Sequence, residues 1–116
     1  MIIKYDEELD ILSIRDENKK IKSSLRVGPH ILDFSFDGKV VGVEILNASE
    51  TLGESLNLDE GAFKDVEKAS IRNIIKPDVL LVVLTLIIRK KEYVPILNIP
   101  LKHRIEHNNM ASLKLV

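Results

Sequence analysis

The stretch HILDFSFDGKVVGVEILNAS, residues 30–49, organises this chain because it predicts a β-hairpin. Two apolar runs flank the dipeptide Asp37-Gly38, which is typical of a two-residue type I′ turn with positive backbone φ angles. A turn centred there fixes the register and places the bulky apolar side chains of both strands on one core-facing side. The predicted cross-strand pairs are Phe36 with Lys39, Phe34 with Val41, Leu32 with Val43 and His30 with Ile45.

The opposite face of this hairpin has a mixed composition. It carries Ile31, Asp33, Ser35, Val40, Gly42, Glu44 and Leu46. Because this face contains both polar and apolar side chains, it can meet either solvent or a partner.

Shorter β runs precede the hairpin. Residues 2–5 and 9–15 lie on either side of the acidic turn 6–8, so a second hairpin is predicted, with Leu12 and Ile14 on one face of its second strand. Residues 21–27 indicate a weak strand or a loop that ends before Gly28 and Pro29. Since successive strands usually pair, we expect sequential neighbours in the sheet.

After residue 46 the pattern changes to that of a helix. A short helical turn is predicted at 50–52, ended by Gly53. A longer helix is predicted from the N-cap Asn57 to about Lys68, because Glu60 lies three positions after the cap. Its apolar side would consist of Leu58, Ala62, Phe63 and Val66.

Runs 69–76, 79–90 and 93–101 predict the last strands, with turns at 77–78 and 90–92. The middle run is apolar on both faces, so we expect a central strand with one face on the core and the other under a helix or another subunit. Pro95 and Pro100 remove backbone donors and place the last strand at a sheet edge. We therefore predict one α+β domain over 1–101, mainly an antiparallel β-sheet of about six to seven strands with one short helix inserted near the middle. A polar tail or docking segment follows at 102–116.

Composition argues against several classes of protein. The chain has no cysteine, which removes disulfides, thiolate metal sites and cysteine nucleophiles. Its net charge of -1 and its aromatic share of 4% give little support to nucleic-acid binding. The longest apolar run, residues 79–88, is far shorter than the roughly 20 residues of a membrane helix. We expect a cytoplasmic protein that uses no cofactor.

Two separated motifs resemble a known family. The first is Tyr5-Asp6-Glu7-Glu8-Leu9-Asp10-Ile11-Leu12-Ser13-Ile14, and the second comprises Asp33-Phe34, Asp37-Gly38-Lys39-Val40-Val41-Gly42-Val43-Glu44-Ile45-Leu46 and Ala48-Ser49. In this order they resemble the small prokaryotic proteins called domain of unknown function 2283, over about residues 1–50. The resemblance implies a small bacterial or archaeal α+β protein without an established activity. It also implies a gene-pair partner, since some relatives are suspected antitoxins.

Two interpretations of the polar residues in this region stay open. In the structural one, Asp6 and Asp10 shape turns, and Gly42 leaves room for close packing across a sheet. In the alternative, acidic side chains converge at one sheet end and bind a small molecule or a divalent cation through hard oxygen ligands. The candidate ligand-binding residues are Asp6, Asp10, Asp33, Glu44 and His30, and neither a catalytic set nor a metal site is assigned.

Two further clusters have a simpler explanation as solvated side chains. His103 and His107 are four residues apart beside Glu106, a metal-ligand spacing on a helix, but no third ligand is in view. The basic residues Lys19, Lys20, Lys22 and Arg26 would form one patch with residues 89–91 only if the two segments met. We expect charged turns that protect the aggregation-prone run 79–88.

The sequence favours a non-catalytic protein–protein interaction module. It has excess apolar strand surface, and it contains neither a Gly-x-Ser-x-Gly nucleophile elbow nor a phosphate-binding glycine loop. We expect a homo-oligomer, with a protein partner encoded nearby in the antitoxin-like version. The alternative function is binding of a small molecule or divalent metal.

Overall fold

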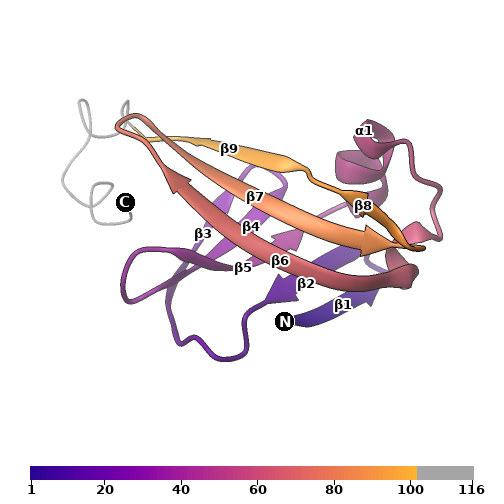
Figure 1. Ribbon diagram of the computed structural model, residues 1–116, viewed down its shortest axis with the longest axis horizontal. Coiled ribbons are helices and arrows are strands. Elements are labelled where there is room, and N and C mark those ends of the chain that lie inside the picture. The colour runs from indigo at the N-terminus through magenta and orange to yellow at the C-terminus, as the bar shows by residue number, and fades with distance from the viewer. Residues whose placement is uncertain (102–116) are drawn as a thin grey trace.

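The expected hairpin lies in a five-stranded antiparallel sheet, here called the first sheet. The computed structural model describes residues 1–101. The strands of this sheet are β1 (Ile2–Asp6), β2 (Ile11–Arg15), β3 (Ile21–Val27), β4 (His30–Ser35) and β5 (Val40–Ile45). β4 and β5 form the hairpin of residues 30–49, and β1 and β2 form the predicted N-terminal hairpin (Figure 1).

The turn between β4 and β5 is one residue longer than predicted. The Ser35 N–H donates to the Lys39 carbonyl at 2.9 Å, and the Gly38 N–H donates to the Ser35 carbonyl at 3.1 Å, which leaves residues 36–38 as the loop. Within this loop only Gly38 has a positive φ, at 81°, whereas a type I′ turn needs two such residues. The Ser35 hydroxyl also donates to the Asp37 carboxylate. The predicted two-residue turn is therefore wrong.

The longer turn shifts the register near the tip of the hairpin. The pairs farthest from the turn are confirmed, namely Leu32 with Val43 and His30 with Ile45. Phe34, however, pairs with Val40, and Val41 becomes the extra residue of a bulge. As a result Val40 rather than Val41 joins the apolar core, and Phe36 lies at the tip with 70% of its surface exposed.

The strand order corrects the prediction that sequential strands pair throughout. The order is β1-β2-β5-β4-β3, so β5 lies between β2 and β4, and β3 forms an edge. β5 is buried along nearly all of its length, while Lys22, Ser24 and Arg26 of β3 are exposed. An apolar strand is more stable in the centre of a sheet and a charged one at its edge, and this difference accounts for the order.

The helical segment differs most from the prediction. Its elements are η1 (Ser49–Gly53), a π-helical turn, then α1 (Glu54–Leu56) and the 3-10 turn η2 (Ala62–Asp65). Asn57 does not begin a helix; it adopts a left-handed φ of 56° and ends α1. The Leu58 N–H donates to the Gly53 carbonyl at 2.8 Å, which is a helix-closing bond that favours asparagine at the left-handed position. The predicted helix over 57–68 is therefore wrong.

The second sheet confirms the expected central strand. Its strands are β6 (Val66–Ile75), β7 (Val79–Ile88), β8 (Lys91–Tyr93) and β9 (Ile96–Pro100). β6 pairs with one side of β7, while β8 and β9 both pair with the other side. The predicted strand 93–101 is interrupted around Pro95, and its two pieces lie at the expected edge. The turn before β8 is formed by Arg89 and Lys90 rather than by residues 90–92.

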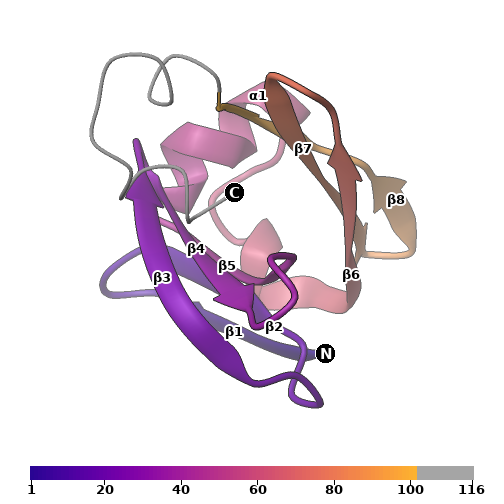
Figure 2. The same ribbon diagram turned by 90° about the vertical axis from the view of Figure 1, so that its left-hand side faces the viewer.

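The inner faces of the two sheets enclose one apolar core, with the helical segment at one end (Figure 1, Figure 2). β7 contributes Leu80, Val82, Leu84, Leu86 and Ile88 to this core. Ala48 and Phe63 add fully buried side chains from the helical segment. The predicted α+β class with mainly antiparallel strands is confirmed. The predicted six to seven strands of one sheet are, over residues 1–101, nine strands in two sheets, because the chain forms a separate sheet after the helical segment. In that range no helix is long and apolar enough to span a membrane.

The side chain of Asn73, in the second sheet, bonds the backbone of Val40 in the first sheet as a neighbouring strand would. Asn73 of β6 accepts a hydrogen bond from the Val40 N–H at 2.8 Å and donates to the Val40 carbonyl at 3.0 Å. Val40 lies beside the bulge at the end of β5. The Asp16 N–H, at the end of β2, donates to the carbonyl of the next residue, Val41, and the backbone N–H and carbonyl of Val40 bond to Asn73 of β6 instead. Asn73 therefore holds the two sheets together at the end of β5.

Replacing Asn73 with alanine should lower the free energy of unfolding by about 1–2 kcal/mol, because both backbone groups of Val40 lose their partner in a half-buried position. Asn73→Asp should also destabilise the protein, since its carboxylate accepts from the Val40 N–H but repels the Val40 carbonyl. Chemical denaturation measures both effects. Equal stability of the wild type and both variants would show that Asn73 does not connect the sheets.

Candidate functional site

The residues of the first motif meet the end of the second motif at Asp10. The Tyr5 hydroxyl donates to Asp10 Oδ1 at 2.6 Å, and the Ser49 hydroxyl donates to the same oxygen at 3.0 Å. The Ser49 N–H bonds to both carboxylate oxygens at 3.1 and 3.2 Å, and the Ala48 N–H bonds to the Asp10 carbonyl at 2.9 Å. Asp10 has a φ of 55°, in the left-handed region that aspartate tolerates. We call Tyr5, Asp10 and Ser49 the Asp10 latch.

A recess of about 490 Å³ opens beside the Asp10 latch. Its lining consists of Tyr5, Glu7, Asp10, Ser49, Glu50, Glu60, Gly61 and Lys64. Lys64 Nζ lies 3.4 Å from Glu7 Oε2, so the one cation of this lining is paired. Burial and the hydrogen bond to Asp10 raise the pKa of the Tyr5 hydroxyl, which keeps it protonated as a donor. Asp10 is thus occupied in holding its own chain together.

Asp33 and Glu44 lie elsewhere, on the outer face of the first sheet. They line a groove of about 250 Å³ together with Ile2, Lys4, Ser13, Ile14, Arg15 and Val43. The Ser24 hydroxyl donates to Asp33 Oδ1 at 2.6 Å. A Cβ added to Gly42 would lie 2.6 Å from Asp33 Oδ2, so this glycine permits the close packing across the sheet that the sequence predicted.

Asp6 and His30 lie in two further places. Asp6 Oδ1 accepts the Leu9 N–H at 3.0 Å and shapes the turn between β1 and β2. His30 begins β4 opposite Ile45 on the core side, where burial lowers the pKa of its imidazole. Of the five candidate ligands, only Asp33 and Glu44 share a groove. Over residues 1–101 no group of three histidine or acidic side chains could hold a metal ion.

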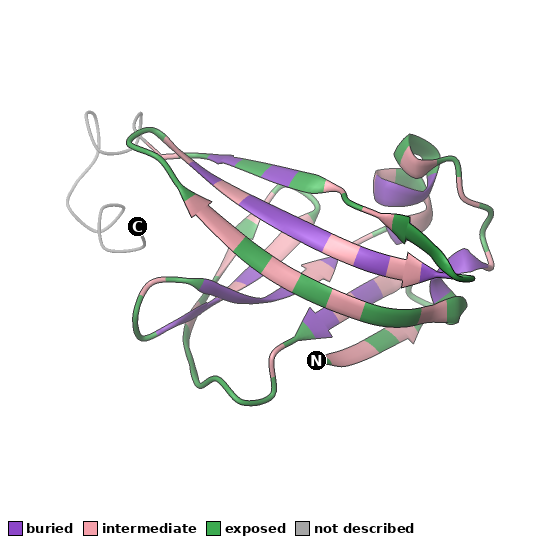
Figure 3. Ribbon diagram, viewed as in Figure 1, coloured by how far each residue is buried: buried purple, intermediate pink, exposed green. Residues whose placement is uncertain are grey.

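The outer face of the second sheet is the largest departure from a solvated β surface. β7 points Leu81, Val83 and Ile87 outward, and the register places Ile74 of β6 and Ile96 of β9 beside them. Ile96 is 57% exposed, while Val83 is largely enclosed by its neighbours in the sheet. In Figure 2 the first sheet and the helical segment lie on one side of this sheet, and no described element lies on the other. In Figure 3, half-buried positions alternate with buried ones along much of β7, and exposed positions alternate with half-buried ones along much of β6.

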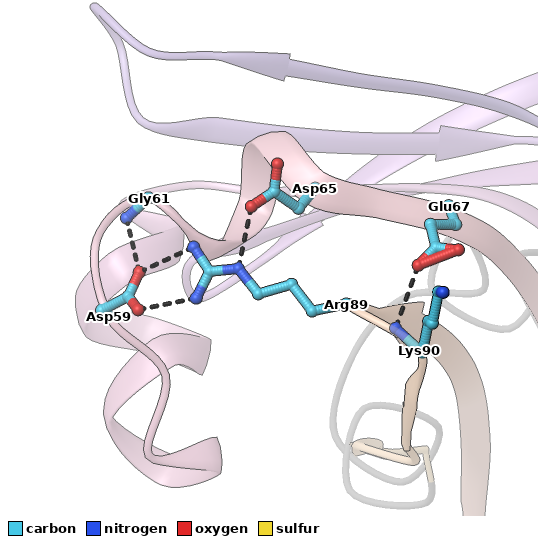
Figure 4. Close-up of polar contacts among 6 residues, drawn as sticks. All are labelled: Asp59, Gly61, Asp65, Glu67, Arg89 and Lys90. Carbon is cyan, nitrogen blue, oxygen red and sulfur yellow. Dashed lines mark hydrogen bonds and ion pairs between the residues drawn. The ribbon is translucent and has the colours of Figure 1, made fainter.

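The turn that joins β7 to β8 is held by acidic side chains (Figure 4). The Arg89 guanidinium forms two hydrogen bonds to Asp59, at 2.7 and 3.2 Å, and one to Asp65 at 2.8 Å. The Arg89 guanidinium holds the pKa of the Asp59 carboxyl below its usual range. The Lys90 N–H donates to Glu67 at 3.0 Å. Arg89 is thereby committed to this cluster rather than to a basic patch with residues 19–26.

Replacing Lys90 with glycine should raise the free energy of unfolding by about 0.5–1 kcal/mol. Arg89 and Lys90 have φ angles of 51° and 66°, which cost a non-glycine residue roughly 1–2 kcal/mol, partly offset by the flexibility that glycine adds to the unfolded chain. Arg89→Gly relieves the same strain but removes the contacts to Asp59 and Asp65, so its melting temperature should rise less or fall. Thermal denaturation compares the two variants; a lower stability of Lys90→Gly would contradict this account.

The structure brings together residues that the sequence did not connect. Ser49 lies 39 positions from Asp10, so no local spacing in the sequence pairs the two residues. Tyr5 lies five positions from Asp10, and only the fold shows that its hydroxyl bonds the carboxylate. The apolar outer face, in contrast, was indicated by the two-sided pattern of residues 79–88. The histidine pair His103 and His107 and the predicted tail 102–116 lie outside the described residues.

Comparisons with known proteins agree with the motif positions. Residues 2–49 match the sequence model of a family described as protein of unknown function (DUF2283). An uncharacterised protein of Methanocaldococcus jannaschii, MJ0789, is 46% identical over 48 residues, which is 41% of this chain and 41% of that protein. The chain therefore spans less than half of the length of this curated relative. No solved structure matches the chain. The segment that matches the DUF2283 model contains β1 to β5 and all three residues of the Asp10 latch.

Proposed function

We propose that this protein is a non-catalytic interaction protein that self-associates through the outer face of its second sheet. The observation that supports this function is the composition of β7. Its inner side chains pack in the core, and its outer ones include Leu81, Val83 and Ile87, with no described element above them. Thr85 is the one polar side chain of this strand. An antiparallel sheet with one solvated face normally alternates apolar and polar side chains, so a strand apolar on both faces favours a second contact.

The first sheet provides an internal comparison. Its outer face mixes polar and charged side chains with isoleucines, since Ile2 pairs with Arg15 and Ile31 with Glu44, and it is less apolar than the outer face of β7. The polar and charged ones include Lys4, Ser13, Arg15 and Glu44. The same chain thus has one sheet suited to solvent and one suited to a partner. A second copy of the chain is the partner to which we assign this apolar face.

The polar clusters support a structural rather than a catalytic role. The Tyr5 and Ser49 hydroxyls both donate to Asp10, so neither is positioned against a free base. Asp33 is bonded to Ser24, and His30 lies apart on the core side of β4. These contacts stabilise turns and strand junctions.

Sedimentation of the full chain from about 1 to 100 µM tests the proposal. The wild type should form dimers, and Ile96→Lys should remain monomeric, because a lysine at this exposed position opposes burial of the outer face. Ile75→Lys is a matched control: Ile75 is 64% exposed on the same sheet but pairs with the core-facing Leu80 rather than lying on the outer face. A wild type that is strictly monomeric over this range would contradict self-association.

An antitoxin-like role for the same protein is supported only by the resemblance of residues 2–49 to the DUF2283 family, in which some members are suspected antitoxins. It predicts that the product of a neighbouring gene forms a complex with this chain. Co-expression of the two and purification through one of them tests this role. Failure of the second protein to co-purify would remove its support without affecting self-association.

A further inference from the structure

We propose that two copies pair face to face about a two-fold axis running along β7, so that Lys68 of each copy lies opposite Glu92 of the other. This arrangement rests on the self-association proposed above and specifies its geometry. It follows from where the charged residues lie around the apolar stripe of β7.

The register of the second sheet places its outward side chains in rows across β6, β7 and the β8–β9 edge. One end row is Lys68, Ile87 and Glu92, and a middle row is Arg72, Val83 and Ile96. The next row is Ile74, Leu81 and Asn98. The stripe is therefore largely apolar in its centre, basic along β6, and acidic at Glu92 on the opposite edge.

Only some two-fold axes make this pattern complementary to itself. An axis along β7 exchanges the two edges, so β6 of one copy covers β8 and β9 of the other. Lys68 then meets Glu92 on both sides of the axis, and Arg72 lies over the apolar Ile96. An axis across the strands instead places β6 over β6 and brings Arg72 against Arg72. Since like charges in contact oppose association, charge complementarity selects the axis along β7.

Lys68 and Glu92 are available for such a contact. Both are exposed, and neither forms an ion pair or a side-chain hydrogen bond within residues 1–101. Two nearby cations are already paired, Arg89 with Asp59 and Asp65, and Lys64 with Glu7. Among the described residues of the outer face, the unpaired cations Lys68 and Arg72 thus lie along β6, and the unpaired Glu92 lies on the opposite edge.

The size of the face predicts a dimer of moderate affinity. Strands about 4.8 Å apart that rise about 3.3 Å per residue give this three-strand face a flat footprint of roughly 450 Å². Standard stable interfaces bury about 800 Å² of accessible surface on each partner. We therefore expect a micromolar dissociation constant for the dimer. At this affinity, the two Lys68–Glu92 pairs contribute to the strength of the dimer and also determine how the two copies are oriented.

Charge reversal tests the arrangement. Lys68→Glu and Glu92→Lys should each weaken dimerisation about tenfold, because each creates two like-charge contacts in the homodimer. The double variant Lys68→Glu/Glu92→Lys should recover the wild-type dissociation constant within about threefold. A mixture of the two single variants should form heterodimers more tightly than either variant forms homodimers, because both contacts are then of opposite charge. Lys4→Glu, on the outer face of the first sheet, is the control that should leave dimerisation unchanged.

Sedimentation and native mass spectrometry measure these constants. If Ile96→Lys abolishes the dimer but both charge reversals leave it unchanged, the two-fold along β7 is wrong while self-association through the face stands. If each single variant weakens the dimer but the two variants do not form a heterodimer tighter than their homodimers, Lys68 does not lie opposite Glu92 and the two-fold axis along β7 is wrong. A strictly monomeric wild type overturns both this arrangement and the proposed function.

Discussion

Replacing Asp10 with alanine is expected to lower the free energy of unfolding by about 3 kcal/mol. The substitution removes the acceptor of the Tyr5 hydroxyl and of both donors of Ser49, and it leaves these groups half-buried without a partner. Alanine also tolerates the left-handed φ of 55° at this position less well than aspartate does. The effect should appear as a lower denaturation midpoint with little change in slope.

The control for this substitution is Asp10→Asn. Asparagine keeps an oxygen acceptor and adopts the left-handed conformation readily, so Asp10→Asn should cost only about 1 kcal/mol. Tyr5→Phe removes one donor of the latch and should fall between these limits. If Asp10→Ala and Asp10→Asn are equally stable, the latch contributes no hydrogen-bond energy and the residue would be free for another role.

Replacing Phe63 with alanine should lower the free energy of unfolding by about 4 kcal/mol, the largest loss that we expect from one substitution. Phe63, in the 3-10 turn η2, is 1% exposed and belongs to the apolar core cluster. Its ring centroid lies 5.8 Å from that of Tyr5, and a Cβ added to Gly53 would lie 3.5 Å from the Phe63 ring. Alanine would leave a cavity that these neighbours cannot fill without moving.

Phe63→Leu is the matched control for this cavity. Leucine fills most of the volume, so its loss should be less than half of that of alanine, as read from urea denaturation. Because Phe63 packs on Tyr5 of the Asp10 latch, Phe63→Ala and Asp10→Ala should not be additive in one chain. Strict additivity would show that the latch and the core are energetically independent.

Several features of the fold could be predicted because they depend on neighbours in the sequence. The alternation of residues 30–35 and 40–45 indicates two strands, and Gly38 supplies the positive φ of their turn. The apolar run 79–88 could be recognised as a central strand. The turn length could not be predicted, because Asp37-Gly38 suits both a two-residue turn and the observed loop, and the bond between Ser35 and Asp37 favours the longer one.

The failed helix prediction has the same kind of cause. Asn57 has two competing local preferences, at the start of a helix and in the left-handed position that ends one. The preceding segment, η1 and α1, already buries Leu52, and the chain then closes through the bond from Leu58 to Gly53. Tertiary packing thus decided which preference of Asn57 was used.

The periodic features of this protein follow from its amino-acid sequence alone: the hairpin of residues 30–49, the two-sided apolar strand β7, and the motifs that match the DUF2283 family. Other features depend on tertiary packing, namely the insertion of β5 beside β2, the contact of Asp10 with Ser49, and the bonds of Asn73 to Val40. The difference arises from distance along the chain. Side-chain alternation and turn geometry act over a few residues, whereas the contacts of Asp10 and Asn73 join residues more than 30 positions apart and form only when two apolar faces pack together.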